Sequence, residues 1–222
     1  MNLSRHLEVF NPTDCVSSIH IIGLGATGAN IGVQLVKLGI EELHVYDFDD
    51  VEEHNIANQV YNRYHVGTYK TVSFIDIVGR INPNCKIKSF NERVTKKIIR
   101  EKILSGIIFL CVDSMGTRKE LMEEFCMGLS IPSLIIDTRM GKDKGSIFSI
   151  SQSDYQFWKE NSQYGDADSE VSACGTSISV YPTANTIASI AVWQFIKKVN
   201  GKTPEKKVLF AFQDNVDIIT TK

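Results

Sequence analysis

An apolar run ends in a glycine-rich turn at Ser18-Ile19-His20-Ile21-Ile22-Gly23-Leu24-Gly25-Ala26-Thr27-Gly28-Ala29-Asn30-Ile31. The three glycines follow the G-x-G-x-x-G spacing, in which the first makes the tight turn, the second lets backbone approach a phosphate, and the third lets a helix pack on a strand. A tight strand-to-helix turn without a ligand can use the same glycines. Because strand, loop and helix arrive in the order that a phosphate site needs, the stretch predicts a nucleotide-binding unit.

Length and charge narrow the class of protein. The chain has 222 residues and a formal net charge of −2, so we expect a single α/β domain over residues 1–222. The balanced charge gives no support for a nucleic acid or an anionic membrane as partner. Residues 1–17 lack the apolar core of a signal peptide, and no run is long enough to span a bilayer. We therefore expect a short leader on a cytoplasmic protein.

The five cysteines are odd in number and widely spread, and they form no C-x-x-C pair. They are Cys15, Cys85, Cys111, Cys126 and Cys174. This pattern argues against both a disulfide framework and a four-cysteine zinc site. We expect reduced thiols and no structural zinc.

A second predicted strand, over residues 42–46, ends at Asp47-Phe48-Asp49. This position is about 20 residues beyond the glycine loop, where an acidic side chain can accept hydrogen bonds from ribose hydroxyls. The alternative is that Asp47 and Asp49 are ordinary acids of a surface loop. Their place directly after a strand favours the ribose role.

Strands and helices alternate along the rest of the chain. Further strands are predicted over 86–90, 106–112, 133–137, 146–150 and 207–212, and helices after Gly28, over 70–81, 95–104 and 116–129, and from Pro182 to Gly201. This alternation predicts a Rossmann-like, doubly wound and mainly parallel sheet with helices on both faces.

Three stretches are predicted to be irregular. Residues 50–69 are polar, and a long loop inside a compact domain is more often functional than incidental. Residues 138–145 are interpreted as a basic turn that contains glycine. Residues 151–172 are the most polar stretch, which indicates either a mobile substrate loop or a plain solvated connection.

Asp113 follows the apolar run 106–112, which is typical of a central parallel strand covered on both faces. Ligands of open α/β sheets bind beyond the carboxyl ends of the strands, so Asp113 is expected at the same crevice as the glycine loop. It can bind a metal ion there or cap the following helix. Arg118 and Arg139 are interpreted as shaping the crevice or forming surface ion pairs.

Several ordered motifs together resemble the ThiF/MoeB-type adenylyltransferases, a superfamily that includes the ubiquitin-activating enzymes. They are the glycine loop, the Asp47-Phe48-Asp49-Asp50-Val51-Glu52 run, Asn55 with Gln59, Gly67 with Lys70, Ile81-Asn82-Pro83, and Cys111-Val112-Asp113 with Arg118. The resemblance covers residues 18–150 and returns over 175–198. Members bind ATP and Mg²⁺ and activate the C-terminal carboxylate of a small ubiquitin-like protein or peptide as an acyl adenylate, releasing pyrophosphate.

The resemblance implies a role for each matching residue. The loop residues Gly23, Gly25, Ala26, Thr27 and Gly28 would lie by the phosphates, Asp47 would hold the ribose with Asp49 nearby, Asn55 and Lys70 would contact the phosphates beside Asn58 and Gln59, and Asp113 would bind Mg²⁺. A carboxylate that attacks the α-phosphate is an anion approaching an anion, so the reaction needs cationic charge. Lys70 and the Mg²⁺ ion would supply it, although a lone lysine at a helix start is usually solvent-exposed. A homodimer or heterodimer is also implied.

The sequence departs from the family pattern in three ways. Relatives usually carry N-x-x-R-Q where this chain has Asn55-Ile56-Ala57-Asn58-Gln59, and Asn58 cannot replace the charge or the bidentate fork of an arginine. Arg63, or Arg5 of a partner subunit, could take over. The paired C-x-x-C motifs are absent from these residues, and we expect no separate catalytic-cysteine or ubiquitin-fold domain.

Cys174 is the candidate for a thioester or persulfide step, because it lies among small residues in a polar stretch. An inert buried cysteine is the alternative. Two other functions compete with an adenylyltransferase. A catalytically impaired, adenylation-like partner subunit would explain Asn58, and an NAD-dependent oxidoreductase would explain the glycine loop with Asp47 but would leave Lys70 and Asp113 without a joint role.

Overall fold

One mixed sheet forms the centre of the molecule. The computed structural model describes residues 1–129, 131–165, 178–212 and 216–222. Their strands are β1 (Ile19–Ile22), β2 (Glu42–Tyr46), β3 (Lys86–Phe90), β4 (Ile107–Leu110), β5 (Leu134–Met140), β6 (Lys144–Ile150), β7 (Lys207–Ala211) and β8 (Asp217–Thr221). The strand order is β3-β2-β1-β4-β5-β6-β7-β8. Pairing is parallel from β3 to β5 and antiparallel from β5 to β8.

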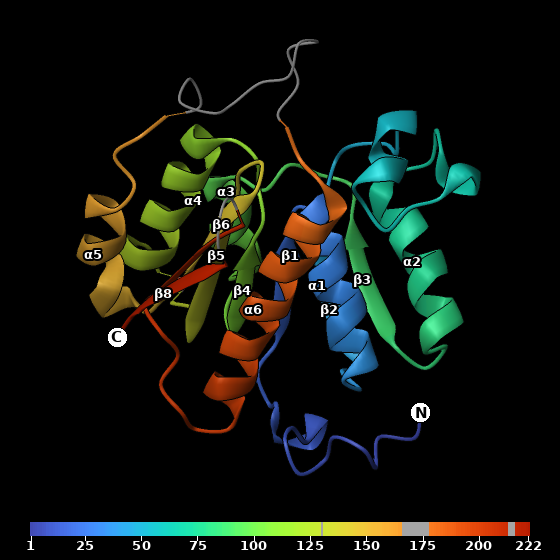
Figure 1. The fold of residues 1–222 in the computed structure, drawn as a ribbon, viewed down its shortest axis with the longest axis horizontal. Helices are drawn as coiled ribbons and strands as arrows, with labels where there is room; N and C mark the ends of the chain where they lie inside the picture. The colour runs from blue at the N-terminus through green and yellow to red at the C-terminus, as the bar shows by residue number, and fades with distance from the viewer. Residues whose placement is uncertain (130, 166–177, 213–215) are drawn as a thin grey trace.

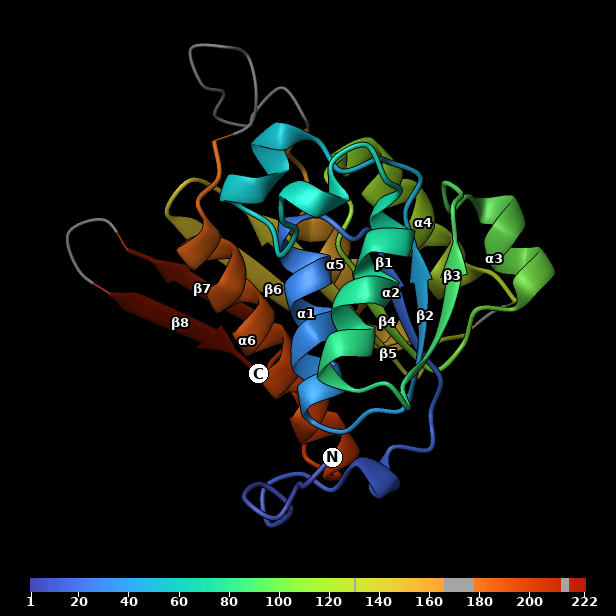
Figure 2. The ribbon, with the colours of Figure 1, turned by 90° about the vertical axis from the view of Figure 1, so that its right-hand side faces the viewer.

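Helices cover both faces of this sheet (Figures 1 and 2). One layer contains α1 (Ala26–Lys37), α2 (Lys70–Ile81) and α6 (Tyr181–Val199), and the other contains α3 (Lys96–Lys102), α4 (Met115–Met127) and α5 (Tyr155–Glu160). Short 3-10 helices are η1 (Pro12–Asp14), η2 (Glu53–Ala57), η3 (Arg63–His65) and η4 (Gln152–Asp154). The predicted doubly wound, Rossmann-like class is confirmed.

Local signals in the sequence explain most element boundaries. All four residues of β1 and of β4 are buried, as expected for strands that lie between two helix layers and are apolar except for His20. Thr95 caps α3 by accepting a hydrogen bond from the Ile98 N–H, and Pro182 occupies the first turn of α6. Gly39, with a φ of 93°, follows the end of α1.

The carboxyl-terminal half of the sheet differs from the prediction at two places. The supposed turn over 138–145 is wrong, because β5 continues to Met140 and β6 begins at Lys144. The two strands pair as far as Met140 opposite Gly145, beyond the apolar residues from which the strands were predicted. Strand β8 was not predicted. All five of its residues are exposed, so the strand has no buried alternation for a sequence pattern to detect.

The expectation of a loop over 151–172 is wrong for its first part. Residues 152–160 form η4 and α5, and α5 buries Trp158, which is 1% exposed, against the second helix layer. A six-residue helix with one fully buried side chain is too short to show helical periodicity. Residues 166–172 lie outside the described residues.

Residues 1–17 pack across the amino ends of the strands, on the edge opposite the loop that contains η2 (Figure 1). Phe10 is buried, with its ring centroid 5.6 Å from that of Phe195. The Val9 carbonyl accepts a hydrogen bond from Asn200 at 2.8 Å. The leader therefore joins the core beside α6. Among the helices that the structure describes, none combines the length and the apolar character needed to cross a bilayer.

We predict that Gly28→Ala destabilises the fold. A Cβ at Gly28 would lie 1.9 Å from the Gly23 carbonyl oxygen, and such overpacking against backbone costs about 2 kcal/mol or more. Gly79→Ala is the matched control, because a Cβ at this exposed position of α2 meets nothing within 4 Å and alanine has a higher helix propensity than glycine. Urea denaturation measures both variants. Equal free energies of unfolding for the two variants would contradict the prediction.

Candidate active site

The glycine loop runs from β1 into the first turn of α1. Gly23 has a φ of 93°, and a Cβ there would lie 2.7 Å from the Cys111 carbonyl oxygen, so the turn requires glycine. A Cβ on Gly25 would meet nothing within 4 Å. Gly25 is also the N-cap of α1 and provides no side chain to the first-turn N–H groups. Backbone donors and the positive end of the helix dipole are thus available to an anion, an arrangement that suits a phosphate.

Asp47 follows β2 and holds the glycine loop from the side. Its Oδ2 accepts a hydrogen bond from the Leu24 N–H at 2.6 Å, and its Oδ1 accepts one from the Asp49 N–H at 2.9 Å. Burial raises the pKa of Asp47 above its usual value, and the Lys70 ammonium opposes that shift. Each carboxylate oxygen keeps a further lone pair. Asp47 can therefore accept from a ribose hydroxyl while it holds the loop.

Lys70 begins α2, and its ammonium lies beside two carboxylates. Lys70 Nζ is 2.7 Å from Asp49 Oδ2 and 4.0 Å from Asp47 Oδ1. Only 9% of the lysine side chain is exposed, so the interpretation of an ordinary surface lysine is wrong. Because a buried ammonium costs free energy unless it is paired, the two aspartates stabilise the cation where it lines the cleft.

Residues 50–69 form a closed and ordered loop. Asp50 pairs with Tyr69 in an isolated bridge at its base, and two 3-10 helices fill it. Asn55 is buried, and its Oδ1 accepts a hydrogen bond from the Glu52 N–H at 2.9 Å. Since the amide oxygen of Asn55 is used within the loop, its Nδ2 is the group that can donate to a phosphate.

Asn58 ends η2 on the wall of the cleft. Its Nδ2 donates to Ser179 Oγ at 2.5 Å, which ties the loop to the segment that enters α6. The Oδ1 of Asn58 and the Oε1 of Gln59 are buried without a hydrogen-bond partner among the described residues. Neither Arg5 nor Arg63 lines the cleft, so within one described chain neither replaces an arginine at position 58.

Asp113 lies beyond the carboxyl end of β4 and is exposed. Its Oδ1 accepts a hydrogen bond from the Ser114 N–H at 2.8 Å. The cap of α4 is Ser114, whose hydroxyl accepts from the Thr117 N–H, so Asp113 does not cap that helix. The Oδ2 of Asp113 has no partner among the described residues. It is the oxygen available for a ligand.

An open cleft of about 1510 Å³ connects these groups. Among the predicted site residues, those that line it are Gly23, Gly25, Ala26, Thr27, Asp47, Asp49, Asn55, Asn58, Gln59, Lys70 and Asp113. Gly28 does not line the cleft but packs beneath the loop. Cys174 lies outside the described residues. Every other residue of the predicted site therefore borders one space.

The donor set fits Mg²⁺ that arrives with a nucleotide. Among the described residues, no group of three or more His, Cys, Asp or Glu side chains could hold a metal ion. Mg²⁺ commonly uses one or two carboxylates together with phosphate oxygens and water. Asp113, with one free carboxylate oxygen at the cleft, meets that requirement.

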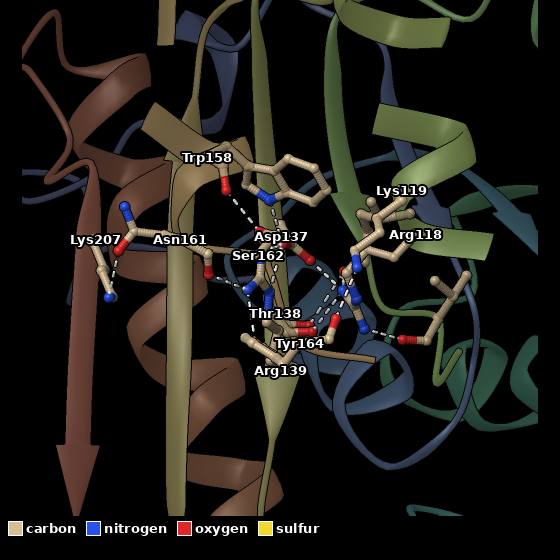
Figure 3. Close-up of polar contacts among 12 residues, drawn as sticks. Arg118, Lys119, Asp137, Thr138, Arg139, Trp158, Asn161, Ser162, Tyr164 and Lys207 are labelled. Carbon is tan, nitrogen blue, oxygen red and sulfur yellow. Dashed lines mark hydrogen bonds and ion pairs between the residues drawn. The ribbon is translucent and has the colours of Figure 1, made fainter. Parts of the chain in front are cut away.

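A buried charge cluster lies beside the carboxyl end of β4 (Figure 3). Asp137, which is fully buried in β5, pairs with Arg118 of α4 and with Arg139, whose Nη2 is 2.8 Å from Asp137 Oδ2. Trp158 Nε1 donates to the same Oδ2 at 2.7 Å. Both arginines line the cleft and are less than 9% exposed. The interpretation of surface ion pairs is therefore wrong, whereas a place at the crevice is right.

In this cluster two arginine side chains face the single carboxylate of Asp137. Burial alone would raise the pKa of Asp137, but Arg118 and Arg139 outweigh it and hold that pKa below its usual value. Arg139 also donates to the Tyr164 hydroxyl at 2.7 Å and to Ser162 Oγ at 2.6 Å. These bonds attach the segment after α5 to the sheet (Figure 3).

Comparison with known proteins assigns the chain to a family. Residues 15–220 match the model of the ThiF family. The chain belongs to the ThiF family. Molybdopterin-synthase adenylyltransferase of Salmonella typhimurium is 30% identical over 103 residues, which are 46% of this chain and 41% of that relative. Ubiquitin-like modifier-activating enzyme 5 of Arabidopsis thaliana is 32% identical over 78 residues, which are 35% of this chain and 18% of that protein.

Solved structures share the fold of this ThiF-family chain. The crystal structure of E. coli MccB with ATP has a TM-score of 0.75 at 16% identity and covers 95% of this chain and 65% of MccB. PaaA has a TM-score of 0.71 at 21% identity, over 95% of this chain and 75% of PaaA. The ThiF-family chain thus matches less than half the length of the two sequence relatives and about two thirds of MccB.

Several buried residues that support the walls of this ThiF-family cleft without lining it were not predicted from the sequence. Asp137 was assigned only to a strand, although it ends the predicted strand 133–137, the same signal that identified Asp47 and Asp113. Trp158 lay in the supposed loop. Tyr61 is buried and donates to the Leu24 carbonyl at 2.8 Å, and no local pattern marked it.

We predict that Cys111, which lines the cleft, reacts slowly with alkylating agents. Burial raises its pKa to about 12 despite the hydrogen bond from Thr138. At pH 8 its thiolate fraction is then on the order of a thousandfold below that of a free cysteine. Cys85, with a pKa raised to about 11, should react faster than Cys111.

Iodoacetamide labelling followed by peptide mass spectrometry measures both rates, and the guanidinium-unfolded chain provides the reference. The prediction is wrong if native Cys111 is modified as quickly as in the unfolded chain.

Proposed function

We propose that this chain is an ATP-dependent adenylyltransferase that activates a carboxylate, namely the C-terminus of a small ubiquitin-like protein or a peptide, as an acyl adenylate with release of pyrophosphate. The observation that carries the proposal is the convergence of Lys70, Asp47 and Asp113 on the cleft that begins at the glycine loop. They come from three separate elements. Together they supply a ribose acceptor, a buried cation and a metal ligand around one phosphate-binding turn.

The reaction uses these groups in order. The glycine loop and α1 hold the phosphates through backbone N–H groups, and Asp47 accepts from the ribose. A substrate carboxylate oxygen then attacks the α-phosphorus, the bond from that phosphorus to the bridging oxygen breaks, and pyrophosphate leaves with the electron pair. Negative charge accumulates on the phosphate oxygens during this step, and the Lys70 ammonium stabilises it. Mg²⁺ bound at Asp113 would add a second positive charge at the phosphates.

The shape of the cleft supports an extended carboxylate substrate. Beyond the glycine loop it continues over the antiparallel strands, where Ser146, Leu209 and Ile219 line it. A chain terminus lying along this surface could reach the phosphates. Two of the relatives' names fit this proposal, because one is an adenylyltransferase and the other activates a ubiquitin-like modifier. We also propose that the chain assembles into a homodimer or a heterodimer.

A catalytically impaired partner subunit is the second candidate. The observation that favours it is Asn58. This residue brings no positive charge to the cleft, and its amide donates a hydrogen bond to Ser179. On this alternative the chain holds a substrate or completes the site of another subunit. An NAD-dependent oxidoreductase is less well supported, because it gives the buried Lys70 ammonium and its ion pair with Asp49 no chemical task.

We predict that ATP binds in the presence of Mg²⁺ and that NAD binds far more weakly, as calorimetry with each ligand would show. Labelled pyrophosphate should exchange into ATP with peptides that carry a free carboxyl terminus but not with their amidated counterparts. Lys70→Ala should lower exchange on the order of a hundredfold or more, because it removes a transition-state cation. Lys97→Ala, on the exposed surface of α3, is the matched control. Tight NAD binding without ATP binding would reject the proposal.

We also predict that Asn58→Arg increases the affinity for ATP in the presence of Mg²⁺ about tenfold, because the arginine adds a charge-assisted hydrogen bond to a phosphate. Asn58→Gln controls for the broken bond to Ser179. Calorimetry of ATP binding tests the affinity and the exchange assay tests turnover. Exchange that appears only in Asn58→Arg would favour the impaired-subunit alternative. Equal affinity in both variants would show that position 58 does not face the phosphates.

A further inference from the structure

The backbone directly before Asp113 is held by hydrogen bonds from one buried side chain. Arg118 of α4 donates through Nη2 to the Val112 carbonyl, the group directly before Asp113. Its Nη1 donates to the Leu110 carbonyl at 3.3 Å and to the Thr138 carbonyl at 3.0 Å. One guanidinium therefore joins the carboxyl ends of β4 and β5 at the point where the chain turns into the cleft (Figure 3).

Arg118 in turn depends on Asp137. Arg118 is 3% exposed and Asp137 is fully buried, so water can solvate these two charges only slightly. Oδ1 of Asp137 pairs with Arg118, while Oδ2 receives Arg139 and Trp158. The division of the two oxygens fixes the rotation of the carboxylate, and a planar guanidinium in two-point contact has a fixed orientation.

From this geometry we infer that Asp137 is a positioning residue for Asp113, acting through Arg118 and the Val112 carbonyl. Asp137 touches neither nucleotide nor metal. It holds the guanidinium that sets the backbone of Asp113, and the Ser114 N–H then sets the carboxylate. Groups that orient a metal ligand without touching the metal commonly change metal affinity 10- to 100-fold when they are altered. The inference rests on the proposed function, because it assumes that Asp113 binds Mg²⁺ with ATP.

The decisive quantity is the ratio of ATP affinities with and without Mg²⁺. Asp137→Asn keeps the shape of the side chain but removes the charge that holds Arg118. We expect it to reduce this ratio on the order of 10- to 100-fold and to leave the metal-free ATP affinity within about twofold of wild type. A general distortion of the cleft would instead lower both affinities together. Calorimetry measures the ratio, and paramagnetic resonance of Mn²⁺ in the presence of ATP reports the metal directly.

Trp158→Phe is the matched control. It removes a hydrogen bond to the same carboxylate, through Oδ2, but leaves the Arg118 side of Asp137 intact, and Trp158 does not line the cleft. We expect its affinity ratio to stay within about twofold of wild type. Asp113→Asn gives the ratio for a lost metal ligand. Circular dichroism verifies that each variant is folded at the temperature used.

Asp137→Asn leaves a buried arginine unpaired and can unfold the protein, so Arg118→Lys provides a second test. The lysine keeps a charge for Asp137 but lacks the second nitrogen that holds the Val112 carbonyl. The same loss of metal dependence is expected. An unchanged ratio in the folded variants, or an equal loss in Trp158→Phe, overturns the inference and leaves the proposed function standing. If wild-type protein binds ATP no better with Mg²⁺ than without it, the proposed function fails and the inference falls with it.

Discussion

The cleft exists because the chain leaves the sheet in opposite directions after two neighbouring strands. β1 and β4 are paired in parallel, with Ile22 opposite Leu110. The helix after β1 packs in one layer and the helix after β4 packs in the other. The loops that follow the two strands therefore separate at the carboxyl edge of the sheet. This separation of the backbone leaves a crevice between them. The glycine loop forms one wall and the Asp113 turn forms the other.

Most polar side chains at this crevice are held before any ligand arrives. Asp47 accepts from two backbone N–H groups, Asn55 accepts from one, and the Lys70 ammonium is paired with Asp49. Each group thus has its rotamer fixed by the protein and retains a lone pair or a hydrogen for a ligand. Preorganisation of this kind reduces the ordering that a bound nucleotide and a transition state would otherwise require.

The sequence indicated the parallel half of the molecule better than the antiparallel half. Strands such as β1 and β4 are buried on both faces and read as continuous apolar runs, and the signals at Gly28, Thr95 and Pro182 are local. β8 lacks such a signal because all five of its residues are exposed, and α5 lacks one because its single buried side chain, Trp158, packs on residues far away in the sequence. The same distinction holds at the cleft. Asp47, Lys70 and Asp113 follow from motif and strand-end position, whereas Asp137, Trp158 and the bond from Asn58 to Ser179 arise from tertiary contacts that no spacing encodes.

The order of the strands also bears on how the chain folds. The β5–β6 and β7–β8 hairpins join strands that are close in sequence, but β1 finds β4 only across most of the first half of the chain, with Ile19 opposite Ile107. Closing a long segment lowers the entropy of the chain before the new contacts stabilise it. Pairing between strands that are distant in sequence therefore slows folding. We therefore expect the seam between β1 and β4 to close late. A partly folded chain would then already contain its hairpins while lacking any pocket, so that ligand binding would report on the last contacts to form.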